Sequence, residues 1–232
     1  MPRTRNPNDV LDGFTATAAD SVDLWLRTQT SLAAAHSDLK KAASLDAFVR
    51  VAVAWEVFRS DWHIAAINRD SSTYRASLAA RFRQSLAGGK FAQLEPYVQL
   101  SWPAHLSVAT VRKLLDPLER NISFGENWVD RARSDLAGAL AAKVTALPPA
   151  DLLLVSAAEK LRNAIAHRST SSVDELNSAL VVLHPPVDAQ LVRTTRVTAR
   201  GIAAYLHAQQ ANERRVETWH RRLAEVAEKL RL

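Results

Sequence analysis

Four polar residues in one short stretch have the types and the spacing that acid–base chemistry on an anionic substrate requires. Glu159, Asn163 and His167 follow one another at four-residue intervals, so a helix places them in one row. Arg162 directly precedes Asn163. Imidazole transfers protons near neutral pH, and the planar guanidinium group of arginine binds two phosphate oxygens without losing its proton. The stretch therefore predicts proton transfer combined with phosphate binding.

The same stretch predicts the helix that carries these groups. Its apolar side consists of three large aliphatic residues and two alanines, namely Leu154, Leu161, Ile165, Ala157 and Ala158. On an ideal helix, Arg162 lies about 140° around the axis from His167. For both side chains to reach one phosphate, we expect the helix to loosen near His167. The run of hydroxyl residues at 169–172 favours helix ends and caps, and so permits this.

An interpretation without chemistry fits the same residues. Glu159, Arg162 and Asn163 are typical of an exposed helix face, and His167 is typical of a polar residue satisfied near a helix end. The two interpretations differ in whether the side chains converge in a shared site.

The order Arg162, Asn163 and, four residues later, His167 resembles the signature of the HEPN superfamily, which comprises small all-helical domains with metal-independent ribonuclease sites. Residues 52–58 (AVAWEVF) are similar to the aromatic-acid-aromatic pattern in the first core helix of several HEPN groups. The resemblance covers about residues 45–182. It implies an all-α helical bundle of HEPN type with additional N-terminal and C-terminal helices.

The resemblance also implies a mechanism, with Arg162, Asn163 and His167 as catalytic residues. RNA carries its own nucleophile, so cleavage by the 2′-hydroxyl needs one group to take a proton, one to give a proton and positive charge for the phosphorane. One chain offers a single motif histidine. A twofold dimer would supply the second, in agreement with the symmetric dimer that the resemblance implies. The products would end in a 2′,3′-cyclic phosphate.

Three further residues are supporting candidates around this motif. Glu56 and Glu159 can orient its members, and Arg168 beside the histidine can add phosphate affinity. Alternatively, Glu56 is a solvated or structurally paired carboxylate. No metal or other cofactor is expected.

The expected function is a metal-independent endoribonuclease in a toxin–antitoxin, phage-defence or RNA-processing setting. Its expected partners are RNA, a second copy of the chain and, as a candidate, a cognate antitoxin or regulatory protein. Two alternatives stay open: a catalytically inactive helical module that binds RNA or a protein, and an accessory subunit of a nucleotidyltransferase.

Composition and charge agree with this expectation. Across 232 residues, 30 basic side chains outnumber 24 acidic ones, and a net charge of +6 favours a polyanionic partner such as RNA. The absence of cysteine excludes disulfides, thiolate nucleophiles and cysteine-based zinc sites, and suits a reducing cytoplasm. The sequence shows no signal peptide and no apolar window that would span a bilayer, so we expect a cytoplasmic protein.

Apolar periodicity predicts helices along the whole chain and no strand. The expected helices cover residues 10–39, 45–69, 72–86, 108–118, 125–146, a motif helix after Pro148-Pro149, and 173–183. Residues 90–105 are expected to be irregular, and residues 120–125 to form a turn or loop. We expect a single domain over 1–232, in which 187–232 forms a long C-terminal helical extension of one helix or two. This extension can pack within the subunit or across a dimer.

The helix expected at 72–86 carries a second candidate surface. Arg75, Arg81 and Arg83 are interleaved with Tyr74 and Phe82, a mixture that can follow a phosphate backbone and stack on bases. The alternative is a solvated face with two core aromatics.

Overall fold

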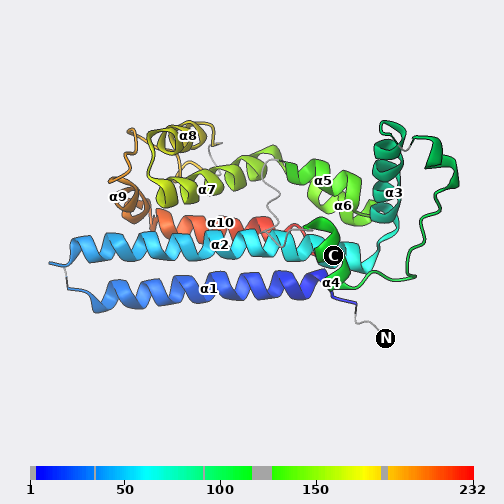
Figure 1. Ribbon diagram of the computed structural model, residues 1–232. Helices are drawn as coiled ribbons and strands as arrows, with labels where there is room; N and C mark the ends of the chain where they lie inside the picture. The colour runs from blue at the N-terminus through cyan, green and yellow to red at the C-terminus, as the bar shows by residue number, and fades with distance from the viewer. Residues whose placement is uncertain (1–3, 34, 91, 117–126, 184–187) are drawn as a thin grey trace. The chain divides into compact units, whose positions relative to one another are not determined.

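The computed structural model describes the chain except for residues 1–3, 34, 91, 117–126 and 184–187 (Figure 1). The described part consists of α-helices, one 3-10 helix and a single pair of short antiparallel strands. The expected all-α fold class is thus confirmed. The expected turn at 120–125 lies outside the described residues.

The chain divides into two compact units. Unit 1 comprises residues 1–10, 59–146 and Leu232, and unit 2 comprises residues 11–58 and 147–231. The two N-terminal helices, α1 (Pro7–Ser31) and α2 (Ser37–Arg69), contribute residues to both units.

Unit 2 is completed by four helices and the strand pair. These are α7 (Pro149–His167), α8 (Thr170–Val181), α9 (Ile202–His207), β1 (Gln209–Gln210), β2 (Glu213–Arg214) and α10 (Arg215–Glu228). Aromatic side chains from distant parts of the sequence meet in its core. Phe14 stacks on Phe58 with ring centroids 4.9 Å apart, and Phe48 meets Trp219 edge to face at 5.6 Å. Such pairs contribute beyond the apolar area they bury.

The helix expected over residues 10–39 is wrong in its extent. The chain forms a helical hairpin instead, with α1 ending at Ser31 and α2 beginning at Ser37. Two contacts hold the hairpin together: Trp25 donates its indole N–H to Ser44 Oγ at 3.0 Å, and Gln29 donates to the carbonyl of Lys40 at 3.0 Å. Folding back lets residues 11–31 and 37–58 bury their apolar stripes in the core of unit 2.

Unit 1 contains the middle of the chain. Its elements are α3 (Ser72–Ala87), η1 (Ala92–Tyr97), α4 (Val108–Leu115), α5 (Trp128–Asp135) and α6 (Gly138–Thr145). Local residues mark two helix ends here: Gly88 follows the last residue of α3, and Ser107 caps α4 by accepting the N–H of Thr110 at 3.1 Å.

The single helix expected over 125–146 is also wrong, because Leu136 and Ala137 have extended backbone and separate α5 from α6. At the end of α5, buried Asp135 accepts hydrogen bonds from Ser134 and Arg81. The next helix, α6, begins at Gly138.

The motif helix α7 keeps its regular geometry through His167, so the loosening expected near that residue does not occur before it. Arg168 then adopts the left-handed conformation, with φ of 52°, and its N–H donates to Ala164 O at 3.0 Å. Ser169 caps α8 by accepting the N–H of Ser172 at 3.2 Å. As a result, α8 begins three residues before the expected position 173.

The expected long C-terminal helix is wrong as a continuous element. Residues 188–201 lack helix, α9 is short, and the strand pair precedes α10. Buried side chains satisfy the backbone of this stretch: Asn177 bonds both N–H and C=O of Val197, and Arg215 donates to Gln190 O at 3.0 Å. The apolar stripe of α10 is buried within the single chain, as in the first of the two arrangements left open by the sequence: Val216, Trp219, Leu223, Val226 and Leu230.

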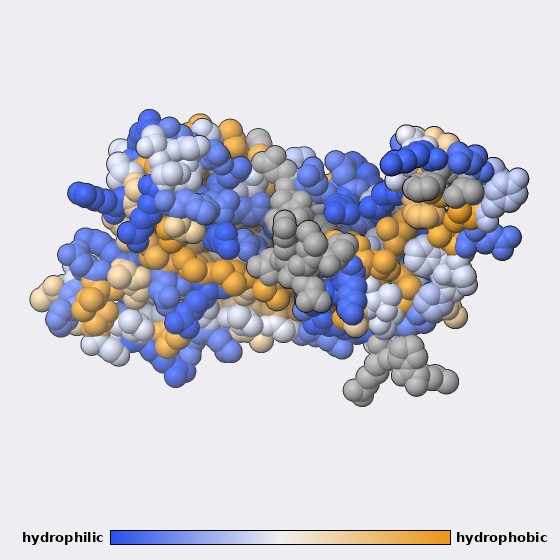
Figure 2. All heavy atoms as spheres, in the orientation of Figure 1, coloured by the Kyte–Doolittle hydropathy of each residue, from blue (hydrophilic) through white to orange (hydrophobic). Residues whose placement is uncertain are grey.

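On the face shown in Figure 2, hydrophobic residues reach the surface between stretches of hydrophilic side chains. Of the helices in the described part, none is by itself long and apolar enough to cross a membrane, and only α6 and α7 taken together across their break reach the required length and composition.

Candidate functional site

The helix α7 buries one side and leaves the motif row on the other. Its buried residues are Asp151, Leu154, Val155, Ala157, Ala158, Leu161 and Ala164. Glu159 and Asn163 are half-buried, and His167 is exposed. We term this partly open side of α7, with Glu159, Asn163 and His167, the motif face.

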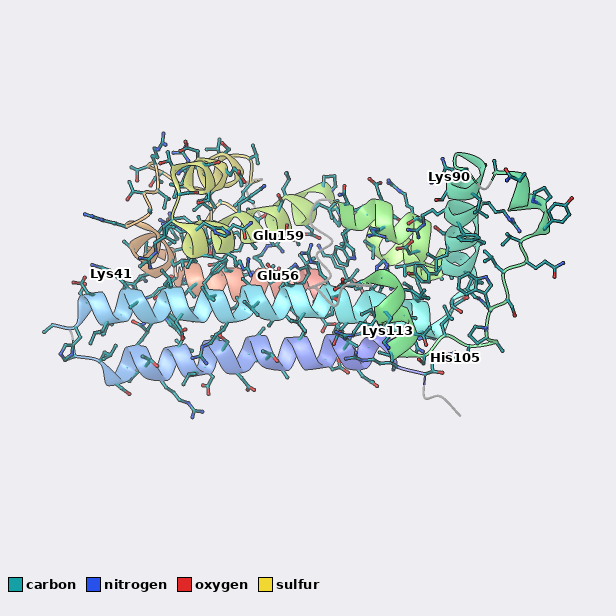
Figure 3. The ribbon with its side chains drawn as sticks, in the orientation of Figure 1. Lys41, Glu56, Lys90, His105, Lys113 and Glu159 are labelled. Carbon is teal, nitrogen blue, oxygen red and sulfur yellow. The ribbon has the colours of Figure 1, made fainter. Side chains whose placement is uncertain are left out.

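One edge of the motif face adjoins α2. There, Arg162 Nη2 lies 3.6 Å from Glu56 Oε2, and Arg162 Nη1 donates to Asn163 Oδ1 at 3.2 Å. Figure 3 shows Glu56 and Glu159 on facing sides of α2 and α7. The structure therefore brings Glu56, Arg162 and Asn163 together, as expected for two motif residues and a supporting carboxylate.

The other edge of the motif face adjoins α8. Lys160 Nζ lies 3.0 Å from Glu175 Oε2 on α8. On an ideal helix, Lys160 is about 160° around the axis from Arg162 but only about 20° from His167. The motif face thus lies between two cations, each held by a glutamate of a neighbouring helix.

Arg162 and His167 do not converge within one chain. In the regular helix they are separated by about 7.5 Å along the axis and about 140° around it. Both His167 and its neighbour Arg168 are exposed to solvent. A single chain therefore provides a positioned guanidinium group and an accessible imidazole group, but not at one phosphate.

The candidate RNA-binding arginines belong to unit 1 and differ in their partners and in their exposure. Arg81 Nη2 pairs with buried Asp135 at 3.2 Å, and Arg75 donates to Pro103 O at 3.2 Å, whereas Arg83 is exposed. Of the two interleaved aromatics, Tyr74 is buried and Phe82 is 42% exposed. Tyr74 therefore belongs to the core and cannot stack on a base, while Phe82 can.

Sequence reasoning missed a buried ionisable pair in unit 1. His63 Nε2 lies 3.6 Å from Asp135 Oδ2, and both side chains are fully buried. Burial lowers the pKa of His63 and opposes ionisation of Asp135, but hydrogen bonds from His63 and Ser134 outweigh it and hold the pKa of Asp135 below its usual range. The helical periodicity of residues 45–69 puts His63 outside the apolar stripe and so predicts a residue that faces water or approaches the motif helix, but His63 is fully buried.

Lys160 and Glu175 were also missed as a pair. The sequence puts Lys160 beside Glu159 in the motif stretch, but only the turn at Arg168 and Ser169 brings α8 back along α7 to present Glu175. No local pattern encodes this contact.

Within the described ranges, no three histidine or acidic side chains converge in a way that would hold a metal ion. Comparisons with protein-family models, curated proteins and solved structures gave no match for this chain. The HEPN resemblance depends on residues 52–58 and on Arg162, Asn163 and His167, and it stays a prediction.

Proposed function

We propose that this protein is a metal-independent endoribonuclease whose active site forms from the motif faces of two copies. The observation that supports it is the partly open motif face of α7, where His167 is accessible and Arg162 is held at the edge by Glu56 and Asn163. We place this activity in the cytoplasm, in a toxin–antitoxin, phage-defence or RNA-processing setting.

In this proposal, two copies related by a twofold axis bring together the proton-transfer and phosphate-binding groups that lie apart within one chain. One His167 takes the proton of the 2′-hydroxyl, whose oxygen attacks the adjacent phosphorus. The His167 of the second copy gives a proton to the departing 5′-oxygen, which leaves a 5′-hydroxyl and a 2′,3′-cyclic phosphate. The guanidinium group of Arg162 neutralises the phosphorane oxygens.

The ion pair with Glu56 leaves Arg162 able to bind phosphate. Both side chains are about one-third exposed, and ion pairs of this kind contribute only about 0 to 1 kcal/mol. A phosphate can therefore share or replace the carboxylate at little cost, while Asn163 keeps the guanidinium group oriented.

A second candidate function is a catalytically silent module that binds RNA or a protein through the same face. The observation that favours it is that Arg162 already has two partners in the isolated chain and lies far from His167. Binding without turnover distinguishes this function from the first.

The test is incubation of purified protein with total RNA in excess EDTA. We expect fragments with 2′,3′-cyclic phosphate ends, and we expect His167→Ala to slow cleavage by about 10²- to 10⁴-fold, the usual contribution of a proton-transfer group. Arg162→Ala should slow it as well, because the phosphorane loses its counter-charge.

His36→Ala is the matched control, since His36 is also exposed but lies between α1 and α2. It should cleave like the unmodified protein. Full activity in His167→Ala would show that this imidazole group transfers no proton and would overturn the proposed site. RNA binding without any cleavage would favour the silent module.

A further inference from the structure

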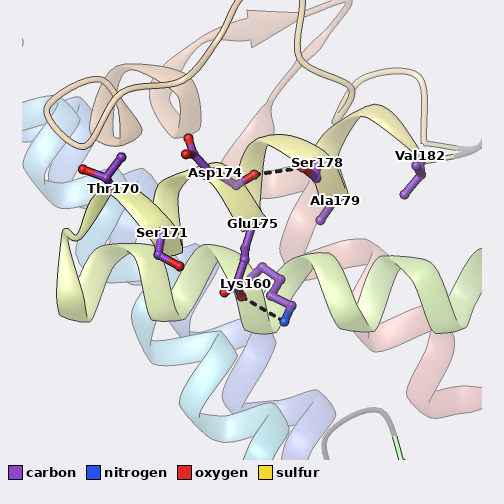
Figure 4. A pocket seen from close by; sticks show the side chains of 8 residues that line it. All are labelled: Lys160, Thr170, Ser171, Asp174, Glu175, Ser178, Ala179 and Val182. Carbon is purple, nitrogen blue, oxygen red and sulfur yellow. Dashed lines mark hydrogen bonds and ion pairs between the residues drawn. The ribbon is translucent and has the colours of Figure 1, made fainter.

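An open pocket of about 800 Å³ lies between α7 and α8, beside the motif face (Figure 4). Its lining combines three kinds of side chain: the charged Lys160, Asp174 and Glu175, the hydroxyl residues Thr170 and Ser171, and the apolar Val182. The volume is within the range of about 300 to 1,000 Å³ that is typical of small-ligand sites.

The pocket is continuous with the motif along the chain. Thr170 follows His167 by three residues, through the left-handed turn at Arg168. Lys160 on the opposite wall is on nearly the same side of α7 as His167, about 20° apart on an ideal helix. A strand of RNA with a phosphate at His167 would therefore bring a neighbouring base to this pocket.

The charges of the pocket favour a neutral group over a phosphate. Lys160 pairs with Glu175 at 3.0 Å, and Asp174 forms an ion pair with Arg196. Two cations and two carboxylates leave no net charge to attract an anion, whereas Arg162 and Arg168 at the motif face carry the positive charge that phosphates require.

The ion pair on the pocket wall sets the hydrogen-bond pattern of the ligand. Glu175 only accepts hydrogen bonds and Lys160 only donates them, so the ligand must present N–H donors directly beside an acceptor. Guanine has two adjacent donors, N1–H and N2–H₂, next to the acceptor O6, so one carboxylate can accept two hydrogen bonds from it. Adenine and cytosine present a single amino group beside a ring-nitrogen acceptor and give the carboxylate only one. Uracil has a single N–H between two carbonyls, which a carboxylate repels, and an arginine side chain offers donors without an acceptor for Lys160.

We propose that this pocket binds a guanine base adjacent to the scissile phosphate, an inference that rests on the proposed ribonuclease function. Glu175 accepts from N1–H and N2–H₂ of the base, and Lys160 donates to O6. Glu175 is half-exposed, so the base competes with the ion pair at little cost. Val182, which is 51% exposed, provides apolar contact for the base.

The test uses the full chain and short 2′-O-methyl RNA oligomers, which cannot be cleaved because the nucleophile is blocked. Oligomers with one guanine, one inosine or one adenine at the same position are compared by fluorescence anisotropy. We expect the guanine oligomer to bind about tenfold tighter than the other two, since inosine lacks the N2 amino group. We expect Glu175→Gln to abolish this preference, because an amide N–H meets the N1–H of the base.

Glu228→Gln is the matched control. Glu228 is likewise a half-exposed glutamate in an ion pair, with Arg231 at 2.7 Å, but it lies on α10. This variant should keep the preference for guanine. A second measurement maps the 5′-hydroxyl ends of cleaved total RNA, which should lie next to guanines for the unmodified protein and be redistributed for Glu175→Gln.

The outcomes separate the two proposals. Cleavage without guanine at the cut sites, or a guanine preference that persists in Glu175→Gln, overturns the pocket assignment and leaves the ribonuclease standing. Guanine-dependent binding without any cleavage supports the pocket and overturns the ribonuclease. Binding of an arginine-rich peptide in place of the guanine oligomer also overturns the assignment and indicates a protein partner.

Discussion

Arg162 and His167 have different surroundings although both belong to α7. Arg162 is held by Glu56 and Asn163, whereas His167 is exposed at the last turn. Removing the imidazole group therefore changes no packed contact, and His167→Ala tests chemistry without disturbing the fold. The preorganised guanidinium group and the accessible imidazole group fit complementary roles in phosphate binding and proton transfer.

Buried His220 makes the stability of unit 2 depend on pH. Its Nδ1 donates to Val216 O at 2.7 Å, and its Nε2 lies 3.1 Å from the hydroxyl of Ser21. Burial lowers the pKa of His220 to about 4, against 6.5 for an exposed imidazole. Because the unfolded chain takes up the proton first, the stabilising contribution is complete above pH 6.5 and is lost as the pH falls towards 4.

We expect this loss to reach about 3 kcal/mol, because each pH unit between the pKa of the folded chain and that of the unfolded chain corresponds to about 1.4 kcal/mol. The measurement is the free energy of unfolding from denaturant titrations between pH 7 and pH 4. In His220→Gln the decrease should be smaller by that amount, whereas His36→Ala should behave like the unmodified protein. An NMR titration that gives His220 a pKa near 6.5 in the folded protein would refute the prediction.

At the scale of elements, one buried guanidinium group joins α10 to two other parts of unit 2. Arg222 Nε donates to Asp188 Oδ1 at 2.7 Å, and Nη2 donates to Asp151 Oδ1 at 3.2 Å in the first turn of α7. All three side chains are almost completely buried. The contact joins α10 to the start of the helix that carries the motif.

We expect Arg222→Ala to lower the free energy of unfolding by about 3 to 5 kcal/mol, because it removes the cation that pairs with the buried carboxylate of Asp188, while Asp151 keeps its ion pair with Lys229. Arg221→Ala is the control on the adjacent, exposed position, where ion pairs with Glu213 and Glu225 contribute under about 1 kcal/mol. Denaturant titrations of both variants provide the comparison. Equal losses would show that the buried network contributes no more than a surface one.

The elements differ in how far the sequence predicts them. Periodic apolar residues predicted the type of almost every helix and several of the ends, such as those of α3 and the start of α4. The break at Leu136, the irregular stretch at 188–201 and the hairpin of α1 and α2 were missed. Each of these depends on contacts between residues far apart in the sequence, which no local pattern encodes.

The candidate site was also predictable only in part. The residues of the motif and their row on α7 follow from four-residue spacing, and that spacing holds in the structure. The partners Glu56 and Glu175 come from α2 and α8, so their contacts follow only from the packing of three helices. The burial of His63 likewise depends on packing between elements.

At the scale of the whole molecule, the proposed site requires two copies, and the requirement predicts how inactive subunits behave. Unmodified and His167→Ala chains are mixed in equal amounts under conditions that exchange subunits. If both imidazoles act in one cleft, only dimers of two unmodified chains cleave RNA. Activity per total protein then falls to about one quarter of that of the unmodified protein. Independent subunits would retain about one half, which would contradict the composite site.

The control for this experiment is the oligomeric state, measured by sedimentation for each variant alone. His167→Ala should associate as the unmodified chain does, because the substitution removes only an exposed imidazole group.

The salt dependence of RNA binding is also a property of the whole molecule. The net charge of +6 predicts an affinity that falls as the salt concentration rises.

The division of unit 2 into residues 11–58 and 147–231 has a consequence for synthesis on the ribosome. Phe48 emerges long before Trp219, the ring that it meets in the core, so the hydrophobic interior of this unit stays open until α10 has been synthesised. Arg162 and His167 emerge before α10 as well. A nascent or prematurely terminated chain that lacks α10 would thus expose apolar surface to chaperones and proteases.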